Sequence, residues 1–402
     1  MSELVTILGA TGSIGRSALD VLRRHDERFQ VYGLSAHHQT KELASLANQC
    51  GAQVVSVRSG QVQAFQNSTH IDGAAITVLE GSEGLVRLAG STTADVVITA
   101  IVGSIGLMPT LAAIRAGKKV LLANKEPLVM MGPEIIQEAS NSGATIMPLD
   151  SEHNAVLQCL DIGQTSNDSK GIKSDTPKSV VKIILTASGG PFIDSSISDL
   201  SRVTPAQAAN HPNWSMGKKI SIDSATMMNK GLELIEACAL FSVDPNLIEI
   251  VVHPQSIVHS LVEYADGSVI AQMANPDMRI PIATALGHPE RIASGASRLR
   301  IGEIGSLDFR EPDENRFPCL RLARQAAEVG GTAPTILNAA NEIAVELFCK
   351  ELIQFNEISK YVDKTLEHVT VDRTRDFETV TQADVEARRY TKQLIRSSTI
   401  SI

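Results

Sequence analysis

A glycine-rich turn near the start of the chain limits the possible folds more than any other part of the sequence. The turn spans residues 9–15 (GATGSIG), follows an apolar run at 4–8 and precedes an amphipathic stretch at 16–24. Glycines let the backbone turn sharply and bring the free N–H groups of a helix N-terminus close to a pyrophosphate. The order strand, turn, helix predicts a dinucleotide-binding βαβ unit; a tight turn without a ligand is the alternative.

Further apolar runs repeat the strand pattern as far as residue 150. We expect strands at 4–8, 31–34, 54–57, 96–100, 120–123 and 145–148, with helices such as 16–24 and 107–116 between them. Strands that alternate with helices indicate a parallel, doubly wound sheet of the Rossmann type in an α/β protein. The runs lack strict polar alternation, as expected for strands covered on both faces.

The rest of the chain follows a different pattern. We expect an exposed loop at 164–178, a strand at 181–186, a helix at 226–241, a hairpin of 257–264 and 269–274 around Asp266-Gly267, and helices from about residue 314, broken at Gly330-Gly331 and Pro334. These elements predict an α+β domain followed by a helical bundle.

Composition excludes several classes of protein. The net charge of -9 argues against nucleic-acid binding, because a phosphate backbone requires a basic face. The sequence has no signal-peptide pattern and no apolar run of membrane-spanning length, and its five cysteines are scattered without a CxxC pair. We therefore expect a cytoplasmic protein with reduced thiols and no membrane partner.

The end of the second expected strand indicates which dinucleotide is bound. In NAD-binding proteins an acidic residue there binds the ribose 2′-hydroxyl. This chain has His37-His38-Gln39 instead. Neutral or cationic donors suit a 2′-phosphate, which favours NADP over NAD. A solvated pair of histidines without a ligand is an equally weighted alternative.

Three acidic residues form the candidate metal site. Asp150 and Glu152 follow the strand at 145–148, and if the backbone stays extended their carboxylates point the same way. Hard cations such as Mg²⁺ or Mn²⁺ prefer such oxygen ligands. An isolated Asp-x-Glu is more often an exposed turn, so a third carboxylate is needed. We expect it to be Glu233, with Glu236 as an alternative ligand or as a group that supports the ligands.

Around Glu233 the sequence places donors suited to a phosphate. In the expected helix, Asn229 and Lys230 share a face with Glu233, and Ser224 is positioned to cap the helix start. The alternative is a solvated, salt-bridged helix face. The turn-rich loop 210–218 carries the single tryptophan, Trp214, which predicts either a lid over a ligand or a loop anchored in the core.

In these residues the chain resembles the 1-deoxy-D-xylulose 5-phosphate reductoisomerase family. The shared segments are 9–15 (GATGSIG), 123–126 (ANKE), 150–154 (DSEHN), 188–192 (SGGPF), 211–217 (HPNWSMG), 224–233 (SATMMNKGLE), 253–256 (HPQS) and 338–342 (NAANE). They keep the family's order across nearly the whole chain. The resemblance implies conversion of 1-deoxy-D-xylulose 5-phosphate to 2-C-methyl-D-erythritol 4-phosphate in non-mevalonate isoprenoid biosynthesis, by metal-assisted skeletal rearrangement and NADPH reduction. Both a retro-aldol route and a concerted shift are compatible with these residues.

The resemblance also implies an organisation and a set of roles. It implies a V-shaped homodimer with an NADPH-binding domain (1–150), a catalytic and dimerisation domain (151–287), a linker (288–313) and a C-terminal helical domain (314–402), and it makes the hairpin around Asp266-Gly267 the candidate interface. The implied cofactor contacts are Thr11, Gly12, Ser13, Ile14, Asn124, Glu126 and Gly217; the metal ligands are Asp150, Glu152 and Glu233; the substrate contacts are Lys125, Ser151, Ser188, His211, Ser224, Asn229 and Lys230; and the lid contains Trp214 and Met216.

The chain departs from the family at one place. Many members have Gly-Lys-Asn where this chain has His37-His38-Gln39, so we expect a weaker or more pH-dependent preference for NADPH over NADH. Two other readings of the sequence are an ordinary NADP-dependent semialdehyde or sugar-phosphate dehydrogenase, whose activity would not respond to a chelator, and a non-catalytic NADP sensor, in which one of Asp150, Glu152 and Lys230 would be lost.

Overall fold

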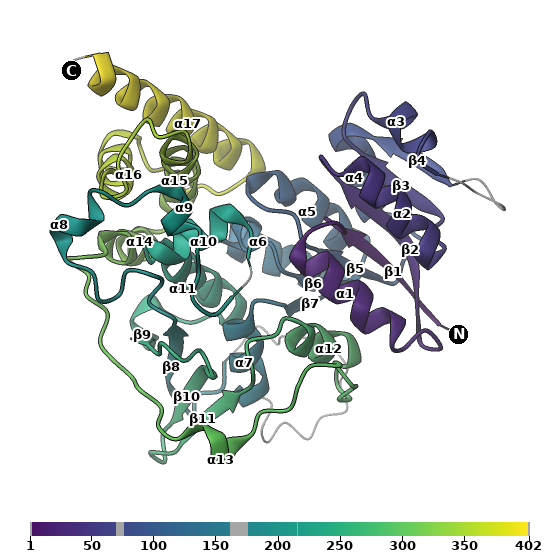
Figure 1. Ribbon diagram of the computed structural model, residues 1–402, viewed down its shortest axis with the longest axis horizontal. Helices are drawn as coiled ribbons and strands as arrows, with labels where there is room; N and C mark the ends of the chain where they lie inside the picture. The colour runs from purple at the N-terminus through teal and green to yellow at the C-terminus, as the bar shows by residue number, and fades with distance from the viewer. Residues whose placement is uncertain (1, 70–75, 161–175, 215, 401–402) are drawn as a thin grey trace.

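The computed structural model describes residues 2–69, 76–160, 176–214 and 216–400 (Figure 1). Its N-terminal part is a seven-stranded parallel sheet with the order β4-β3-β2-β1-β5-β6-β7. The strands are β1 (Glu3–Leu8), β2 (Phe29–Ala36), β3 (Val54–Val57), β4 (Thr77–Glu80), β5 (Val96–Thr99), β6 (Lys119–Leu122) and β7 (Thr145–Pro148). The predicted doubly wound sheet is confirmed, and within this sheet β4 is the strand that was not predicted.

Helices cover this sheet on both faces, as the unbroken apolar strands require. They are α1 (Ser13–Arg23), α2 (Thr40–Cys50), α3 (Val62–Gln66), α4 (Gly81–Ala89), α5 (Leu107–Arg115) and α6 (Glu126–Ser142), with the short η1 (Ser104–Gly106) before α5. Helices α4, α5 and α6 pack in a row, whereas α1 packs against α12 (Arg279–Gly287) from far along the chain. Because β1, β5, β6 and β7 are neighbouring parallel strands, their carboxyl ends lie side by side on one side of the sheet, where the candidate site residues lie.

The second part contains a four-stranded sheet with the order β11-β10-β8-β9. Its strands are β8 (Val180–Ala187), β9 (Ile248–Val252), β10 (Val258–Tyr264) and β11 (Val269–Met273). The predicted hairpin is confirmed, because β10 and β11 pair antiparallel on either side of Asp266-Gly267. The accompanying helices are α7 (Ser151–Leu160), α8 (Ile197–Leu200), α9 (Pro205–Ala208), α10 (Lys218–Ala225), α11 (Met228–Phe241) and η2 (Pro245–Leu247). Most of the predicted loop 164–178 lies outside the described residues.

A long connection with the short α13 (Ile301–Ile304) leads to the C-terminal bundle. The bundle contains α14 (Pro318–Val329), α15 (Ala333–Cys349), α16 (Glu357–His368) and α17 (Phe377–Ile400). Gly330 and Gly331, both with positive φ, separate α14 from α15 as predicted. Pro334 does not break a helix: it lies in the first turn of α15, where its missing N–H is not needed.

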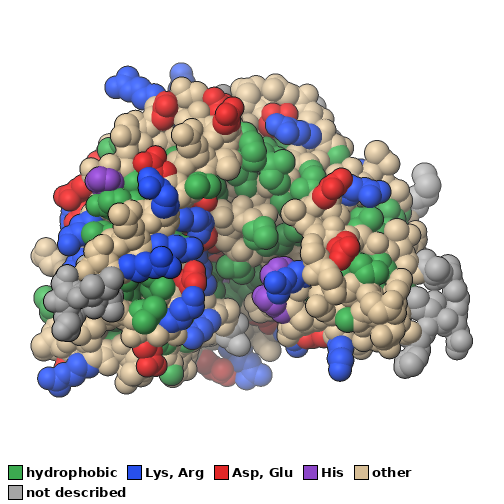
Figure 2. Space-filling model, turned by 90° about the horizontal axis from the view of Figure 1, so that it is seen from above, with side chains coloured by type: hydrophobic (Ala, Val, Ile, Leu, Met, Phe, Trp, Pro, Cys, Tyr) green, Lys and Arg blue, Asp and Glu red, His purple; other side chains and the backbone are tan. Residues whose placement is uncertain are grey.

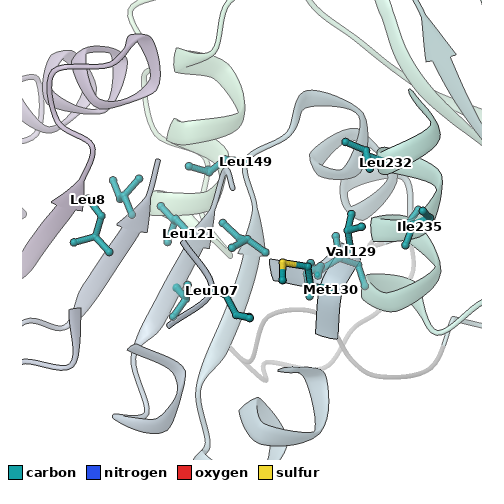
Figure 3. Close-up of a cluster of buried hydrophobic side chains, with 14 of the residues drawn as sticks. Leu8, Leu107, Leu121, Val129, Met130, Leu149, Leu232 and Ile235 are labelled. Atoms are coloured by element: carbon teal, nitrogen blue, oxygen red, sulfur yellow. The ribbon is translucent and has the colours of Figure 1, made fainter. Parts of the chain in front are cut away.

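One hydrophobic core joins these parts. Figure 3 shows buried side chains that run from Leu8 and Leu121 in the parallel sheet to Val129 in α6 and to Leu232 and Ile235 in α11. Each such side chain contributes about 1.5–3 kcal/mol by leaving water. Packing of α6 on α11 therefore fixes the position of the helix that carries Glu233 relative to the end of β6.

Seen from above, the molecule is hollowed between two lobes, with lysine, arginine and hydrophobic side chains along the hollow (Figure 2). Within the described residues, no helix combines the length and the apolar character needed to cross a membrane.

Candidate active site

A cavity of about 630 Å³ opens between the parallel sheet and the second part of the chain. It is lined by residues from the glycine-rich turn, the ends of β5, β6 and β7, helices α10 and α11, and the loop before α10. The predicted site residues that line it are Gly12, Ser13, Ile14, Lys125, Glu126, Asp150, Ser151, Glu152, Ser188, His211, Trp214, Met216, Gly217, Ser224, Asn229, Lys230 and Glu233. Those that do not line it are Thr11, His37, His38, Gln39 and Asn124.

Three carboxylates meet on one wall of the cavity. Asp150, Glu152 and Glu233 each offer an oxygen atom, and these oxygens all lie within 4.8 Å of one another. Asp150 is at the end of β7 and Lys125 follows β6; since Leu122 pairs with Pro148, both reach the same edge of the sheet. Helix α11 supplies Glu233 from the opposite side.

Two lysine ammonium groups lie among these carboxylates. The Lys125 Nζ atom pairs with Asp150 and lies 2.8 Å from Glu233 Oε1. The Lys230 Nζ atom lies 2.6 Å from Glu152 Oε1 and also pairs with Glu233. Asn229 joins the cluster, because its amide donates to Glu233 Oε1 over 2.5 Å and its oxygen accepts from Lys125 over 2.9 Å. The predicted shared face of Asn229, Lys230 and Glu233 is confirmed.

The cluster shifts the pKa values of its members in opposite directions. Burial and the nearby Glu233 raise the pKa of Asp150 to about 7, although Lys125 opposes the shift. Burial alone would raise the pKa of Glu233, but Lys125 and Lys230 outweigh it and lower that pKa to about 2. Burial disfavours the charged form of Lys125, yet Asp150 and Glu233 hold its pKa well above the ordinary value. Lys125 is therefore protonated at neutral pH.

The backbone around the carboxylates differs from the sequence prediction in two places. The chain does not stay extended after Asp150: α7 begins at Ser151, and Glu152 reaches the other carboxylates from the first helical turn. The helix predicted at 226–241 begins at Met228, because Met227 has a φ of 60° and separates α10 from α11. Ser224 therefore lies near the end of α10 and does not cap α11.

Behind the carboxylates, Glu236, the predicted alternative or supporting group, forms a buried pair with His153, which was not predicted. The His153 Nε2 atom contacts the backbone oxygen of Glu233 at 2.9 Å, and its Nδ1 atom lies 3.5 Å from Glu236 Oε2. Burial raises the pKa of Glu236 to about 7. Glu236 does not line the cavity, but with Asp150 and His153 it forms a second group whose potential ligand atoms lie within 4.8 Å of one another. His153 lies three residues after Asp150, in the first turn of α7, and this helical spacing was the sequence signal that His153 belongs near the site.

The hydrogen bonds of His211 fix its tautomer. The backbone N–H groups of Asn213 and Trp214 both point at Nδ1, at 3.2 and 3.0 Å, so Nδ1 is the acceptor. Burial lowers the pKa of His211, which keeps the ring neutral with its proton on Nε2. That Nε2 atom lies 2.8 Å from Ser188 Oγ, which also accepts from the Gly190 N–H. Ser188 thus keeps its own hydroxyl proton for another acceptor.

The loop with Trp214 lies at the cavity. Trp214 is half-buried, lines the cavity, and has its ring centroid 6.1 Å from that of His259. The indole of Trp214 therefore lies against the cavity and not in a distant part of the core. This position agrees with the predicted lid.

The glycine-rich turn has the close backbone approaches expected of a pyrophosphate loop. Gly9 has a φ of 89°, and a Cβ atom there would lie 2.4 Å from the backbone oxygen of Ala100. A Cβ atom on Gly15 would lie 2.5 Å from the Gly9 oxygen. The turn therefore requires glycine at both positions to sit tightly on the end of β5, with the start of α1 facing the cavity.

The two histidines after β2 lie outside the cavity, next to an arginine that the sequence analysis overlooked. His37 Nδ1 is 2.9 Å from His38 Nε2. Because Ala36 pairs with Val57, the exposed Arg58 after β3 lies beside His37. Partial burial, His38 and Arg58 lower the pKa of His37. The register of β2 and β3 would have revealed Arg58.

The carboxylate cluster fits a divalent cation. In an octahedral shell with bonds of about 2.1 Å, ligand oxygens lie roughly 3–4.2 Å apart, so oxygens that already lie within 4.8 Å need only a small inward shift. All three ligands are hard oxygen donors, which suits Mg²⁺ or Mn²⁺.

Family models match almost the whole chain. Residues 5–132 match the model described as 1-deoxy-D-xylulose 5-phosphate reductoisomerase, residues 146–241 match its C-terminal domain, and residues 273–390 match the DXP reductoisomerase C-terminal domain.

Known reductoisomerases of this family are similar in sequence to the chain over nearly their whole length. A 1-deoxy-D-xylulose 5-phosphate reductoisomerase of Stutzerimonas stutzeri (strain A1501) is 53% identical over 96% of each chain, and one of Pseudomonas putida (strain W619) is 52% identical over 98% of each. A crystal structure of DOX-P reductoisomerase in complex with NADPH, fosmidomycin and magnesium has a TM-score of 0.88 and 42% identity, covering 98% of both chains. The Zymomonas mobilis enzyme in complex with NADPH has a TM-score of 0.88 and 43% identity, covering 99% of this chain and 100% of its own.

Proposed function

Because the chain belongs to the 1-deoxy-D-xylulose 5-phosphate reductoisomerase family, we propose that Asp150, Glu152 and Glu233 hold its divalent metal ion at the cavity wall. The observation that supports this site is the approach of these carboxylate oxygens to within 4.8 Å of one another, from segments far apart in sequence. When bound, the ion supplies Lewis-acid chemistry, lowering the pKa of a coordinated hydroxyl and stabilising developing negative charge on oxygen.

The chain is an NADPH-dependent enzyme of non-mevalonate isoprenoid biosynthesis that converts 1-deoxy-D-xylulose 5-phosphate to 2-C-methyl-D-erythritol 4-phosphate. Its cofactors are NADPH and a divalent ion such as magnesium. Family membership decides against the ordinary dehydrogenase and the non-catalytic sensor.

Ser188, Ser224, Asn229 and Lys230 are our proposed contacts to the substrate phosphate, and Ser151, Lys125 and His211 contact the rest of the substrate. The tautomer of His211 leaves the Ser188 hydroxyl free to donate a hydrogen bond into the cavity. A fixed phosphate lets binding energy far from the reacting bonds orient the substrate. Trp214 and Met216 form the lid, which excludes water from the reactive carbonyl groups.

Lys125 acts as a donor and not as a proton acceptor in this proposal. Asp150 and Glu233 hold the pKa of Lys125 well above the ordinary value against the effect of burial, so the side chain is an ammonium donor at the cavity wall. It stabilises negative charge that develops on a substrate oxygen next to the carboxylate cluster. His211 is neutral, so it can orient a hydroxyl group without adding charge.

For the cofactor, we propose that Gly12, Ser13 and Ile14 hold the pyrophosphate at the start of α1, together with Thr11. Glu126 and Gly217 line the cavity where the rest of NADPH extends, and Asn124 supports Glu126 from behind through a short hydrogen bond. His37, His38 and Gln39 surround the 2′-phosphate, and Arg58 supplies a permanent cation beside His37, whose pKa is lowered.

We keep the domain limits 1–150, 151–287, 288–313 and 314–402 as part of the proposal, together with a homodimer joined through the β10–β11 hairpin. Strand β11 forms the edge of its sheet, and Val269 on it is 49% exposed. An edge strand with free backbone groups is suited to pairing with a second copy. A cytoplasmic location stays a prediction, consistent with five free cysteines.

The replacement Glu233→Gln tests the metal site. It keeps the shape of the side chain but removes one ligand charge, so turnover should fall by a factor on the order of 10² or more. NADPH binding, measured by fluorescence titration, should stay close to the wild-type value because the glycine-rich turn is unaltered. Turnover is followed as NADPH oxidation with 1-deoxy-D-xylulose 5-phosphate, with and without added Mg²⁺.

A matched control is Glu249→Gln, whose carboxylate pairs with Lys182 2.5 Å away, outside the cavity lining. This variant should keep wild-type turnover. Near-wild-type activity of Glu233→Gln at all Mg²⁺ concentrations would remove Glu233 from the metal site.

A further inference from the structure

The NAANE motif at 338–342 lies on α15 in the C-terminal bundle, outside the cavity lining, yet its polar side chains reach toward both cavity walls. The Asn341 amide donates to Asp223 Oδ1 over 2.8 Å, and Asp223 lines the cavity from α10. The neighbouring Glu342 accepts a hydrogen bond from the backbone N–H of Ser104 over 3.2 Å. Ser104 belongs to the loop after β5, whose residues Ala100–Val102 also line the cavity.

Glu342 is itself held by an arginine from the last helix. Arg388 of α17 donates to Glu342 Oε2 over 2.6 Å and to Ser104 Oγ over 3.1 Å. Asp384 pairs with the same guanidinium over 2.8 Å. Gly103 has a φ of 85°, and a Cβ atom there would lie 3.2 Å from Glu342 Oε1, so the loop fits closely over this carboxylate.

From its other side, the loop is held by the parallel sheet. The Asn124 amide donates to the Gly103 oxygen over 3.3 Å and also to Glu126. Lys219 links Glu126 to Asp223, with its Nζ atom 2.9 Å from a carboxylate oxygen of each. The contacts therefore close into a ring: loop 103–104, Asn124, Glu126, Lys219, Asp223, Asn341, Glu342 and back to the loop.

We propose that this ring, closed by Asn341 and Glu342 with Arg388, positions the 100–104 loop against NADPH. The C-terminal bundle would then set the cofactor affinity of a site to which none of its described residues contributes a lining side chain. The inference rests on the proposed cofactor site. Four members of the ring, Asn124, Glu126, Asp223 and Asn341, are each no more than 5% exposed. Loss of one partner leaves a buried polar group unsatisfied, so the loop rather than the helix would shift to recover a hydrogen bond with water.

The test compares Glu342→Ala and Arg388→Gln with wild type, with Arg389→Gln as the matched control. Arg389 is next to Arg388 on α17 but is 70% exposed and pairs only loosely, at 3.8 Å, with Glu386. We expect hydrogen exchange of the backbone amides at 100–106 to speed up in the ligand-free variants. The KM for NADPH should rise by about tenfold, the effect of one charge-assisted hydrogen bond. The kcat at saturating NADPH and the KM for 1-deoxy-D-xylulose 5-phosphate should change less than twofold, and Arg389→Gln should match wild type.

A lower melting temperature with unchanged exchange at 100–106 and an unchanged KM for NADPH would make the ring purely structural and overturn the proposal. Faster exchange without a change in the KM for NADPH would also overturn it, since the loop would then move without affecting the cofactor. Arg388→Gln keeps Glu342 and its bond to the loop backbone, so it remains informative if Glu342→Ala does not fold. Failure of wild type itself to bind NADPH would instead refute the proposed cofactor site.

Discussion

At the scale of single residues, the proposed 2′-phosphate site places the preference for NADPH over NADH in the charge around His37. Burial, His38 and Arg58 lower the pKa of His37, which makes protonation of this side chain rare at physiological pH. Arg58 is then the permanent positive charge next to the proposed 2′-phosphate position.

We predict that Arg58→Gln raises the KM for NADPH about fivefold and leaves the KM for NADH unchanged, because a surface charge pair contributes on the order of 1 kcal/mol. In wild type, the KM for NADPH should fall as the pH is lowered through the range in which His37 gains a proton. In the variant this fall should begin at a higher pH, since Arg58 is one cause of the lowered pKa of His37.

Steady-state kinetics with both cofactors between pH 5.5 and 8.5 measure these effects, with Arg87→Gln on α4 as an exposed control. Equal loss of NADPH and NADH use in Arg58→Gln would show that Arg58 supports the loop and not the phosphate.

Most of the predicted site residues line the cavity, because the relevant spacings are local. Helical spacing alone brings Asn229 and Lys230 to Glu233. Two contacts were not predicted, Glu236 beside His153 and Arg58 beside His37, because each joins separate segments of the sequence. Ser224 was misjudged as a cap because nothing in the local pattern indicates the left-handed conformation of Met227 that ends α10.

At the scale of elements, the site depends on how closely α6 and α11 approach. A Cβ atom on Gly132 of α6 would lie only 2.4 Å from the Cβ atom of Ala239 in α11, whereas carbon atoms normally stay about 3.5–4 Å apart. Since α6 starts directly after Lys125 and α11 carries Glu233, the same approach holds these two side chains 2.8 Å apart.

We predict that Gly132→Ala lowers the free energy of unfolding by about 1–3 kcal/mol, as expected for overpacking. It should also raise the Mg²⁺ concentration needed for half-maximal activity, because Glu233 moves away from Asp150. Urea unfolding and a Mg²⁺ titration of activity measure the two effects. The double variant with Ala239→Gly restores the space and should recover most of the Mg²⁺ response. No recovery would mean that this contact does not position Glu233.

Most elements with a strong apolar run were predicted, although β9 (IEIVV) was not, and weak elements were missed. Strands β3 and β7 have the predicted bounds, because their flanking segments are polar or contain glycine. Strand β4 was missed since its four residues, TVLE, are at most partly buried and resemble a loop. Nothing in the sequence indicated that α12 packs against α1, because this contact depends on the surface that the folded parallel sheet presents.

At the scale of the whole molecule, the proposed dimer follows from the free edge of the second sheet. We predict that Val269→Lys on β11 converts the dimer to a monomer at micromolar concentration, because a lysine on an edge strand opposes pairing with another copy. Sedimentation velocity gives the mass directly. Val329→Lys, at the end of α14 and 64% exposed in the free chain, is the control that should stay dimeric. A Val269→Lys dimer with wild-type stability would place the interface elsewhere.

The ring of contacts that holds the 100–104 loop affects the order in which the enzyme folds during its synthesis. Arg388 and Ser104 are 284 residues apart, so the parallel sheet leaves the ribosome long before the helix that steadies its loop has been synthesised. A nascent chain can thus fold a nucleotide-binding sheet early and still lack a fixed loop until translation is almost over. Full affinity for NADPH would therefore appear only late in synthesis, when α15 and α17 dock.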